Sequence, residues 1–212
     1  MIKLYVWPTP NGQKLLIMLE ELGEGYETHF VHLGRDEQFD PAFLAISPNN
    51  KIPAIVDQAA DGGPIAMFES GAILTYLADK TGRFLAPTGP RRWLAMQWLH
   101  WQVGGLGPML GQLAFYGLRS EEKAPLPIRR FTEEATRLLG VLDRRLGEAR
   151  FLAGDDYSIA DIATYPWMKA ASTNFTPLIG DALAASNNIA RWLDEVGARP
   201  AVIAAMAIKP PG

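Results

Sequence analysis

The apolar positions near the N-terminus predict a strand, a helix and a second strand. Residues 2–7 alternate loosely between apolar and mixed side chains, and a dense run of turn residues follows at 8–12. From Leu15 the apolar residues recur at i, i+3, i+4 and i+7, which predicts an amphipathic helix that ends near Gly23. Residues 26–33 favour a second strand. A strand-helix-strand unit of this kind favours parallel pairing with a right-handed crossover.

The pattern that follows is typical of a β-hairpin between two helical segments. An Asp-Gly-Gly-Pro turn separates two short apolar runs, which favours antiparallel pairing of those runs. We expect a short helical turn (40–46), a third strand (54–57), the hairpin turn (61–64), a fourth strand (65–68) and a helix (69–81). Together with the first unit, these elements predict a small α/β domain over residues 1–82.

The rest of the chain has the apolar spacing of helices. A Trp-rich helix over 91–101 precedes a glycine-rich run in which Pro108 is expected to kink or break the helix. A long amphipathic helix comes next, and shorter helices are expected at about 189–196 and from Arg199 to Ile208. The stripe of the long helix comprises Ile128, Phe131, Ala135, Leu138, Leu139, Leu142 and Leu146.

Two Gly and two Pro residues within 82–90 mark a linker between the two patterns. The expected fold class is therefore α/β followed by all-α. We expect an N-terminal domain over 1–82, a linker over 83–90 and an all-helical domain over 91–212.

Residues 157–162 carry the pattern of a helix N-terminus. Ser158 and Asp161 are spaced as a capping box, in which each side chain accepts a hydrogen bond from the other residue's backbone N–H. Tyr157 and Ile162 are spaced to pack on each other across this start. A capping role explains both polar residues, so neither is predicted to be catalytic.

The segment 47–57 (Ser-Pro-Asn-Asn-Lys-Ile-Pro-Ala-Ile-Val-Asp) is the most distinctive stretch of the α/β part. Pro53 cannot donate to a strand ladder, so it belongs at a strand entrance or in a bend. A cis Ile52–Pro53 bond would turn the Ile52 backbone outward, where it can pair with a peptide. Glu69 and Ser70 begin the next helix, whose N–H groups and dipole favour an anion. These features predict a site for a small peptide that bears a carboxylate.

The amino-acid composition excludes several kinds of partner and site. The net charge is −3, which gives no global electrostatic case for a nucleic-acid partner. The apolar runs are too short to span a membrane, and the start lacks the regions of a signal peptide, so a cytoplasmic protein without a membrane partner is expected. The chain has no Cys, so any thiol chemistry must arrive with a ligand. His29, His32 and His100 are too scattered to predict a metal site.

The order of elements, together with Pro53, Glu69-Ser70 and the capping box, resembles the glutathione transferase family over nearly the whole chain. Four stretches resemble the bacterial nu class of that family: Thr9 to Gly12 with Lys14, the segment 47–57, the segment 68–74 and the segment 97–111. The resemblance implies a thioredoxin-like N-terminal domain (βαβ-α-ββα), a homodimer, and glutathione-dependent disulfide-bond oxidoreduction without a metal.

The resemblance also implies the reactive residues. Thr9 and Asn11 would donate hydrogen bonds to the sulfur of glutathione at the start of the first helix, where the dipole also stabilises a thiolate. Without the family, Thr9 is better explained as the N-cap that precedes Pro10. The family's other pattern, an early catalytic Tyr or Ser, is not clearly met, because Tyr5 lies inside the first predicted strand.

The remaining implied roles concern the peptide. Ile52, held by Pro53, would pair its backbone with the cysteinyl amide of glutathione, and Glu69 and Ser70 would bind the γ-glutamyl amino and carboxylate groups. Three further positions are implied or possible contacts: Gln38 near the glycyl end, Lys51 on the peptide, and Arg130 from the partner subunit. Turn chemistry also explains Lys51 and its neighbour Asn50, and an ordinary surface charge also explains Arg130.

Three functions are compatible with these residues. The first is reduction of small disulfides by thiol–disulfide exchange, with two glutathione molecules supplying the sulfur and glutathione disulfide as a product. The second is conjugation of glutathione to electrophiles. The third is a non-catalytic module of the same fold that binds ligands or partners. The presence of the whole set of peptide-binding residues favours the two enzymatic functions over the third.

Overall fold

The computed structural model describes residues 1–211 and divides them into two compact units. One unit, here the N-terminal unit, comprises Met1–Arg83 and the C-terminal segment from Arg199. The other, the helical unit, comprises Phe84–Ala198. No helix in the described part of the chain is long and apolar enough to cross a membrane.

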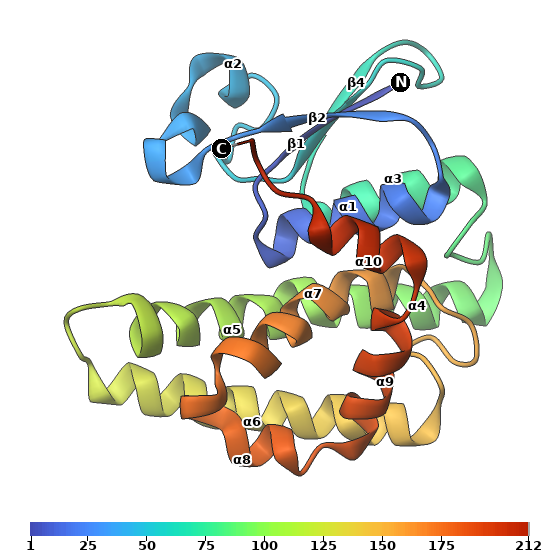
Figure 1. Ribbon diagram of the computed structural model, residues 1–212. Coiled ribbons are helices and arrows are strands. Elements are labelled where there is room, and N and C mark those ends of the chain that lie inside the picture. Colours follow the sequence, from blue (N-terminus) through green and yellow to red (C-terminus); the bar gives the residue numbers. More distant parts are fainter. Residues whose placement is uncertain (212) are drawn as a thin grey trace. The chain divides into compact units, whose positions relative to one another are not determined.

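The N-terminal unit is built on a four-stranded sheet with the strand order β2-β1-β3-β4 (Figure 1). As predicted, β1 pairs parallel with β2, and β3 pairs antiparallel with both β1 and β4. Leu4 at the centre of β1 lies opposite Thr28 and Ile55 and is fully buried. The elements are β1 (Ile2–Val6), α1 (Pro10–Leu22), β2 (Tyr26–Phe30), α2 (Pro41–Leu44), β3 (Ala54–Asp57), β4 (Ile65–Phe68), α3 (Ser70–Thr81) and α10 (Pro200–Ala207), with single 3₁₀ turns at Leu33–Arg35 and Glu37–Phe39.

The last helix belongs to the N-terminal unit, which differs from the expected all-helical domain over 91–212. In Figure 1 the red α10 runs beside the blue α1, and the two helices pack together. Arg199, just before α10, donates from Nη2 to Oε2 of Glu21 on α1 at 2.9 Å. Because α10 and α3 both cover α1, the run Leu15–Leu19 is fully buried, beyond the single apolar stripe that the spacing predicted.

The helical unit contains α4 (Gly89–Trp101), α5 (Gly107–Leu113), α6 (Pro125–Glu148), α7 (Ile159–Asn174), α8 (Thr176–Ala184) and α9 (Asn187–Gly197). The helix α6 buries its predicted stripe from Ala135 to Leu146. The helix α8 was not predicted from the apolar pattern. The expected irregularity near Pro108 is a π-helical segment, Gln102–Leu106, that joins α4 to α5 without leaving helical geometry. Pro108 is the second residue of α5 and follows directly after this segment.

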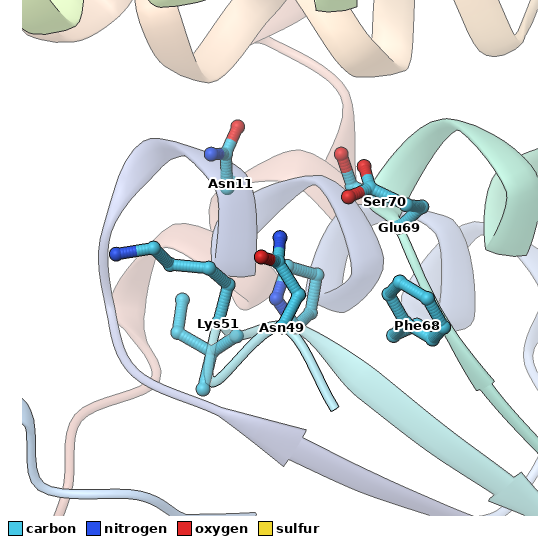
Figure 2. A pocket seen from close by; sticks show the side chains of 8 residues that line it. Asn11, Asn49, Lys51, Phe68, Glu69 and Ser70 are labelled. Atoms are coloured by element: carbon cyan, nitrogen blue, oxygen red, sulfur yellow. The ribbon is translucent and has the colours of Figure 1, made fainter. Parts of the chain in front are cut away.

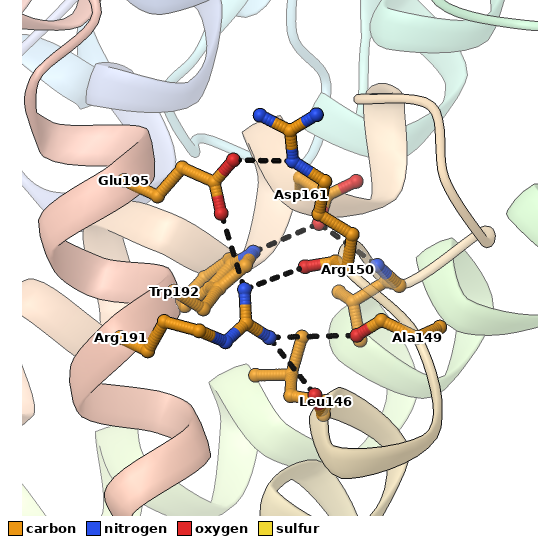
Figure 3. A network of polar contacts seen from close by, with 8 residues as sticks. Leu146, Ala149, Arg150, Asp161, Arg191, Trp192 and Glu195 are labelled. Atoms are coloured by element: carbon orange, nitrogen blue, oxygen red, sulfur yellow. Dashed lines mark hydrogen bonds and ion pairs between the residues drawn. The ribbon is translucent and has the colours of Figure 1, made fainter.

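The predicted capping box is present at the start of α7. Asp161 Oδ2 accepts from the Ser158 N–H at 3.1 Å, and the Ser158 side chain accepts in return from the first turn. The carboxylate also accepts from the N–H of Leu152 and from the indole N–H of Trp192 at 2.9 Å (Figure 3). This fully buried side chain therefore ties three segments of the helical unit together.

Candidate functional site

A cavity of about 150 Å³ opens in the N-terminal unit where three segments meet. The segments are the first turn of α1, the loop that leads into β3, and the junction of β4 with α3. The lining residues are Asn11, Asn49, Lys51, Ile52, Pro53, Phe68, Glu69 and Ser70. Figure 2 shows Asn11 and Lys51 on one side, with Glu69 and Ser70 facing them. Six residues predicted from the sequence are therefore gathered in one place, although their roles there stay predictions.

Hydrogen bonds to the buried Ser47 fix the loop before β3. The hydroxyl of the buried Ser47 donates to the carbonyl of Lys51 at 2.8 Å, and the N–H of Asn50 donates to the carbonyl of Ser47 at 2.9 Å. Asn50 has a φ of 49°, a left-handed conformation that Asn tolerates in turns, so its turn role is the one supported. The Ile52–Pro53 bond is cis. No hydrogen bond within residues 1–211 engages the backbone N–H of Ile52 beside the cavity.

Glu69 and Ser70 form the opposite wall at the start of α3. Glu69 has a φ of 72°, which is uncommon for a residue with a side chain, and such conformations cluster at functional sites. The first N–H groups of α3 have no partner within the helix and no side-chain cap, and the first residue of that turn, Ser70, lines the cavity. An anion bound there would accept hydrogen bonds from these N–H groups and interact favourably with the helix dipole.

Lys14 is a residue of this site that the sequence reasoning placed in a motif without assigning it a role. Its side chain is 1 % exposed, and its Nζ lies 3.2 Å from Oγ of Ser70. Burial lowers the pKa of Lys14 to about 7, while the charge of Glu69 acts in the opposite direction. Its spacing from Ile17 and Met18 on the same buried face was the available signal.

Thr9 and Asn11 flank the start of α1. Asn11 lines the cavity, whereas Thr9 is not among the lining residues. Thr9 stands at the N-cap position and Pro10 is the first residue of α1, as the capping explanation predicts, although the Thr9 side chain makes no capping hydrogen bond. Gly12 brings this turn unusually close to β1, since a Cβ there would lie 2.1 Å from the Trp7 carbonyl oxygen.

The cavity does not include the two remaining predicted contacts. Gln38 lies in the 3₁₀ turn Glu37–Phe39, where its Nε2 donates to Asp36 at 3.2 Å and its Oε1 is buried without a partner. Arg130 is exposed on α6 of the helical unit. Both roles stay predictions.

The histidines have local contacts of their own. His29 stacks on Tyr5 with 4.8 Å between ring centroids, and His32 packs on Trp7 at 4.3 Å. The ring of His100 contacts the Met96 carbonyl through Nδ1 at 2.8 Å. Across residues 1–211, no cluster of three or more His, Cys, Asp or Glu side chains has the arrangement of a metal site.

The charges of the cavity alternate around its wall. Lys51 contributes a positive charge on one side, Glu69 a negative charge on the other, and the start of α3 a partial positive charge backed by Lys14. A short peptide with both a carboxylate and an ammonium group is complementary to this arrangement. The chain supplies no thiol, so a sulfur nucleophile at Asn11 would have to belong to the bound molecule.

Domain families of known proteins match both parts of the chain. The glutathione S-transferase N-terminal domain family matches residues 9–80, and the glutathione S-transferase C-terminal domain family matches residues 108–200. The chain is 48 % identical over 203 residues to the Escherichia coli disulfide-bond oxidoreductase YfcG, covering 95 % of this chain and 92 % of that protein.

Two solved structures share the fold across both units. A glutathione transferase family member from Pseudomonas fluorescens, solved with two glutathione molecules bound, has a TM-score of 0.92 and 46 % identity over 97 % of this chain and 92 % of the other. A glutathione transferase from Pseudomonas putida, solved with one glutathione disulfide per subunit, has a TM-score of 0.93 and 43 % identity over 100 % and 92 %. The thioredoxin-like and all-helical fold class is thereby confirmed, and this chain belongs to the glutathione transferase family.

Proposed function

We propose that this protein is a nu-class glutathione transferase that reduces small disulfides with glutathione. The observation that carries the proposal is the cavity, which gathers the Ile52 backbone, the uncapped start of α3 and Asn11 in a chain without Cys. The relative YfcG is named a disulfide-bond oxidoreductase, which supports this reaction over others of the family.

In this proposal, different residues of the cavity bind the cysteinyl, γ-glutamyl and glycyl parts of glutathione. The N–H and C=O of Ile52 pair with the cysteinyl residue of the peptide. Ser70 and the α3 N-terminus bind the γ-glutamyl carboxylate, while Glu69 binds the neighbouring ammonium group. Lys51, on the opposite side of the cavity, binds the glycyl carboxylate, and Gln38 and the partner subunit's Arg130 complete that end.

Asn11 and Thr9 then act on the sulfur. A thiol with a pKa near ~8.5 is mostly protonated at neutral pH, and the thiolate is the nucleophile. The Asn11 amide, the Thr9 hydroxyl and the N-terminus of α1 all favour the anion, so they lower the pKa of the bound thiol.

The reaction is a pair of thiol–disulfide exchanges. The bound glutathione thiolate attacks one sulfur of the substrate disulfide, which forms a mixed disulfide and releases one thiolate. The thiolate of a second glutathione attacks the glutathione sulfur of this mixed disulfide, releasing the second substrate thiolate and glutathione disulfide. Two glutathione molecules are oxidised for each disulfide reduced, and both substrate thiolates take up the protons that the two glutathione thiols release. Neighbouring structures with two glutathione molecules or one glutathione disulfide support this stoichiometry.

Substitution of Asn11 and Thr9 tests the proposal. With bis(2-hydroxyethyl) disulfide and glutathione, we expect Asn11→Ala and Thr9→Ala each to lower kcat by at least about tenfold, the scale of one lost donor to a developing anion. The pH at which the rate reaches half its maximum should move upward in both variants, because the thiol pKa rises. Asn187→Ala, an exposed position in α9, is the matched control and should leave the rate unchanged. Unchanged rates in both site variants would remove the proposed thiol site.

The second candidate is conjugation of glutathione to electrophiles, which family membership favours. It uses the same bound thiolate but consumes one glutathione for each product. Measuring glutathione disulfide and thioether products on one preparation distinguishes the two reactions.

We also propose a cytoplasmic homodimer. Glutathione keeps thiols reduced in the cytosol, which is the compartment where it can serve as reductant. Exposed apolar side chains outside the cavity, such as Trp93 on α4, are the kind of group that an interface between two copies buries. Light scattering on the purified protein checks the assembly.

A further inference from the structure

Lys14 is a buried lysine that the proposed chemistry does not use. It lies in the first half of α1, where α3 and α10 pack against that helix, and it is 1 % exposed. Its Nζ reaches Oγ of Ser70, the first residue of α3, at 3.2 Å. Ser70 in turn lines the cavity, whereas Lys14 is not among the lining residues, so Lys14 contacts the candidate site through Ser70.

The direction of this hydrogen bond matters for binding. An ammonium group has three donors and no acceptor, so the Ser70 oxygen must accept from Lys14. The single hydroxyl proton of Ser70 is then not used toward Lys14, and it is available to a ligand in the cavity that Ser70 lines. A serine held in this way donates to a carboxylate. Without the ammonium, the same hydroxyl is able to turn and present its lone pairs.

The surroundings of Lys14 contain few charges that would stabilise it. Glu69 is the charged group that acts on it. The residues of α10 carry no ionisable side chain, and Arg199 before that helix pairs with Glu21. The ionisable groups on α3 are Tyr76 and Lys80, which hydrogen-bond to Asp57, and the exposed Asp79.

We propose that Lys14 is a positioning residue for the γ-glutamyl carboxylate of glutathione. Its ammonium fixes Ser70 as a hydrogen-bond donor and supplies a buried counter-charge beneath the N-terminus of α3. This inference rests on the proposed glutathione site and adds the group that prepares its anion-binding end.

Proton uptake follows from the same geometry. In the unliganded protein, burial lowers the pKa of Lys14 to about 7, so a large fraction of the side chain is neutral at pH 7.5. A carboxylate bound at Ser70 adds a negative charge close to Lys14, which favours the ammonium form and raises its pKa. Binding of glutathione therefore takes up part of a proton near neutral pH, and affinity falls as the pH rises above 7.

Calorimetry with S-methylglutathione tests the inference, because this probe carries no thiol that can ionise. We compare the wild type with Lys14→Met and with Lys209→Met, an exposed lysine of the same unit as the matched control. Titrations in buffers of different ionisation enthalpy at pH 6.5, 7.5 and 8.5 give the proton uptake. We expect equal uptake by the wild type and the control and less uptake by Lys14→Met, because the ligand's own amino group contributes equally in all three proteins. We also expect about tenfold weaker binding by Lys14→Met at pH 6.5, with a smaller difference at pH 8.5.

A purely structural role for Lys14 gives a different result. If Lys14 only ties α1 to α3, Lys14→Met lowers the thermal midpoint while the pH dependence of binding by the folded fraction matches that of the wild type, which overturns the inference. Ser70→Ala adds a second arm, since Lys14→Met should weaken binding much less in the Ser70→Ala background than in the wild type. Equal effects in both backgrounds overturn the inference, as does wild-type binding without proton uptake. No binding of S-methylglutathione to the wild type instead overturns the glutathione site itself.

Discussion

At the scale of the residue, the exposure of Lys14 is decided by the fold and not by its place in a helix pattern. A lysine in the first turns of an amphipathic helix is usually solvated, but here α3 and α10 cover the helix and leave Lys14 1 % exposed. Removing a charge from water costs free energy unless partners compensate for it. Lys14 has Ser70 as a hydrogen-bond partner beside the cavity, so a costly charge is kept next to the candidate site.

This cost should appear as a pH-dependent stability. The pKa of Lys14 is about 7 in the folded protein, against 10.5 as the ordinary value. Between these values the unfolded chain binds a proton that the folded protein lacks, so the contribution of Lys14 to the free energy of unfolding rises with pH. From pH 7 to pH 9 this contribution increases by about 2–3 kcal/mol.

The measurement is a comparison of urea denaturation of the wild type and Lys14→Met at the two pH values. Lys14→Met should be the more stable protein at pH 7, and its advantage should shrink at pH 9. A constant difference between the two proteins would show that Lys14 does not titrate in this range.

At the scale of the element, the position of α1 depends on Gly12. A methyl group there would lie 2.1 Å from the Trp7 carbonyl oxygen and 2.6 Å from Val6 Cγ2. Because the nearest atom is backbone, the start of α1 must move to relieve the contact. Asn11 and Thr9 would move with it, since they belong to the same turn.

We therefore expect Gly12→Ala to lower both stability and activity. Overpacking of this kind costs about 1–3 kcal/mol, which urea denaturation will report. Disulfide reduction should fall by more than the loss of folded protein explains. Gly25→Ala is the matched control, because nothing lies within 4 Å of its added Cβ, and it should behave as the wild type. A fully active Gly12→Ala would show that the position of this turn is not needed for the reaction.

At the scale of the whole molecule, the chain leaves the N-terminal unit after Arg83 and returns to it at Arg199. The returning helix α10 covers α1, whose Leu16 and Ile17 are fully buried. The N-terminal unit is thus completed by a segment more than a hundred residues away in the sequence.

Substitutions at two neighbouring positions of α10 test whether this helix packs against the rest of the unit. Val202 is 1 % exposed and Ile203 is 58 % exposed, so the same substitution meets different surroundings. Val202→Asp should destabilise the protein by more than about 3 kcal/mol, because it buries an unpaired charge. Ile203→Asp should change stability by less than about 0.5 kcal/mol. Thermal unfolding followed by circular dichroism compares them, and equal midpoints would contradict the packing of α10.

The sequence by itself determined the local elements and their order. The turn residues before α1, the Asp-Gly-Gly-Pro hairpin and the capping box at Ser158 and Asp161 depend on neighbours a few residues apart, and the structure contains all three. The prediction of one peptide site was local in the same way. It used the proline before β3 in the segment 47–57 and the helix start at Glu69-Ser70, and both segments line the cavity. Such signals are readable because short-range geometry does not depend on the rest of the fold.

Only the tertiary structure decided which side chains share an environment. It brought α10 back to the N-terminal unit, buried Lys14 behind Ser70, and left Thr9 without a capping bond. It also turned the expected break at Pro108 into a π-helical segment. Each of these outcomes depends on contacts between residues that are distant in the sequence or on competition among hydrogen-bond partners. Burial then sets the pKa and the cost of a charge, and burial is a property of the packed fold rather than of any local stretch.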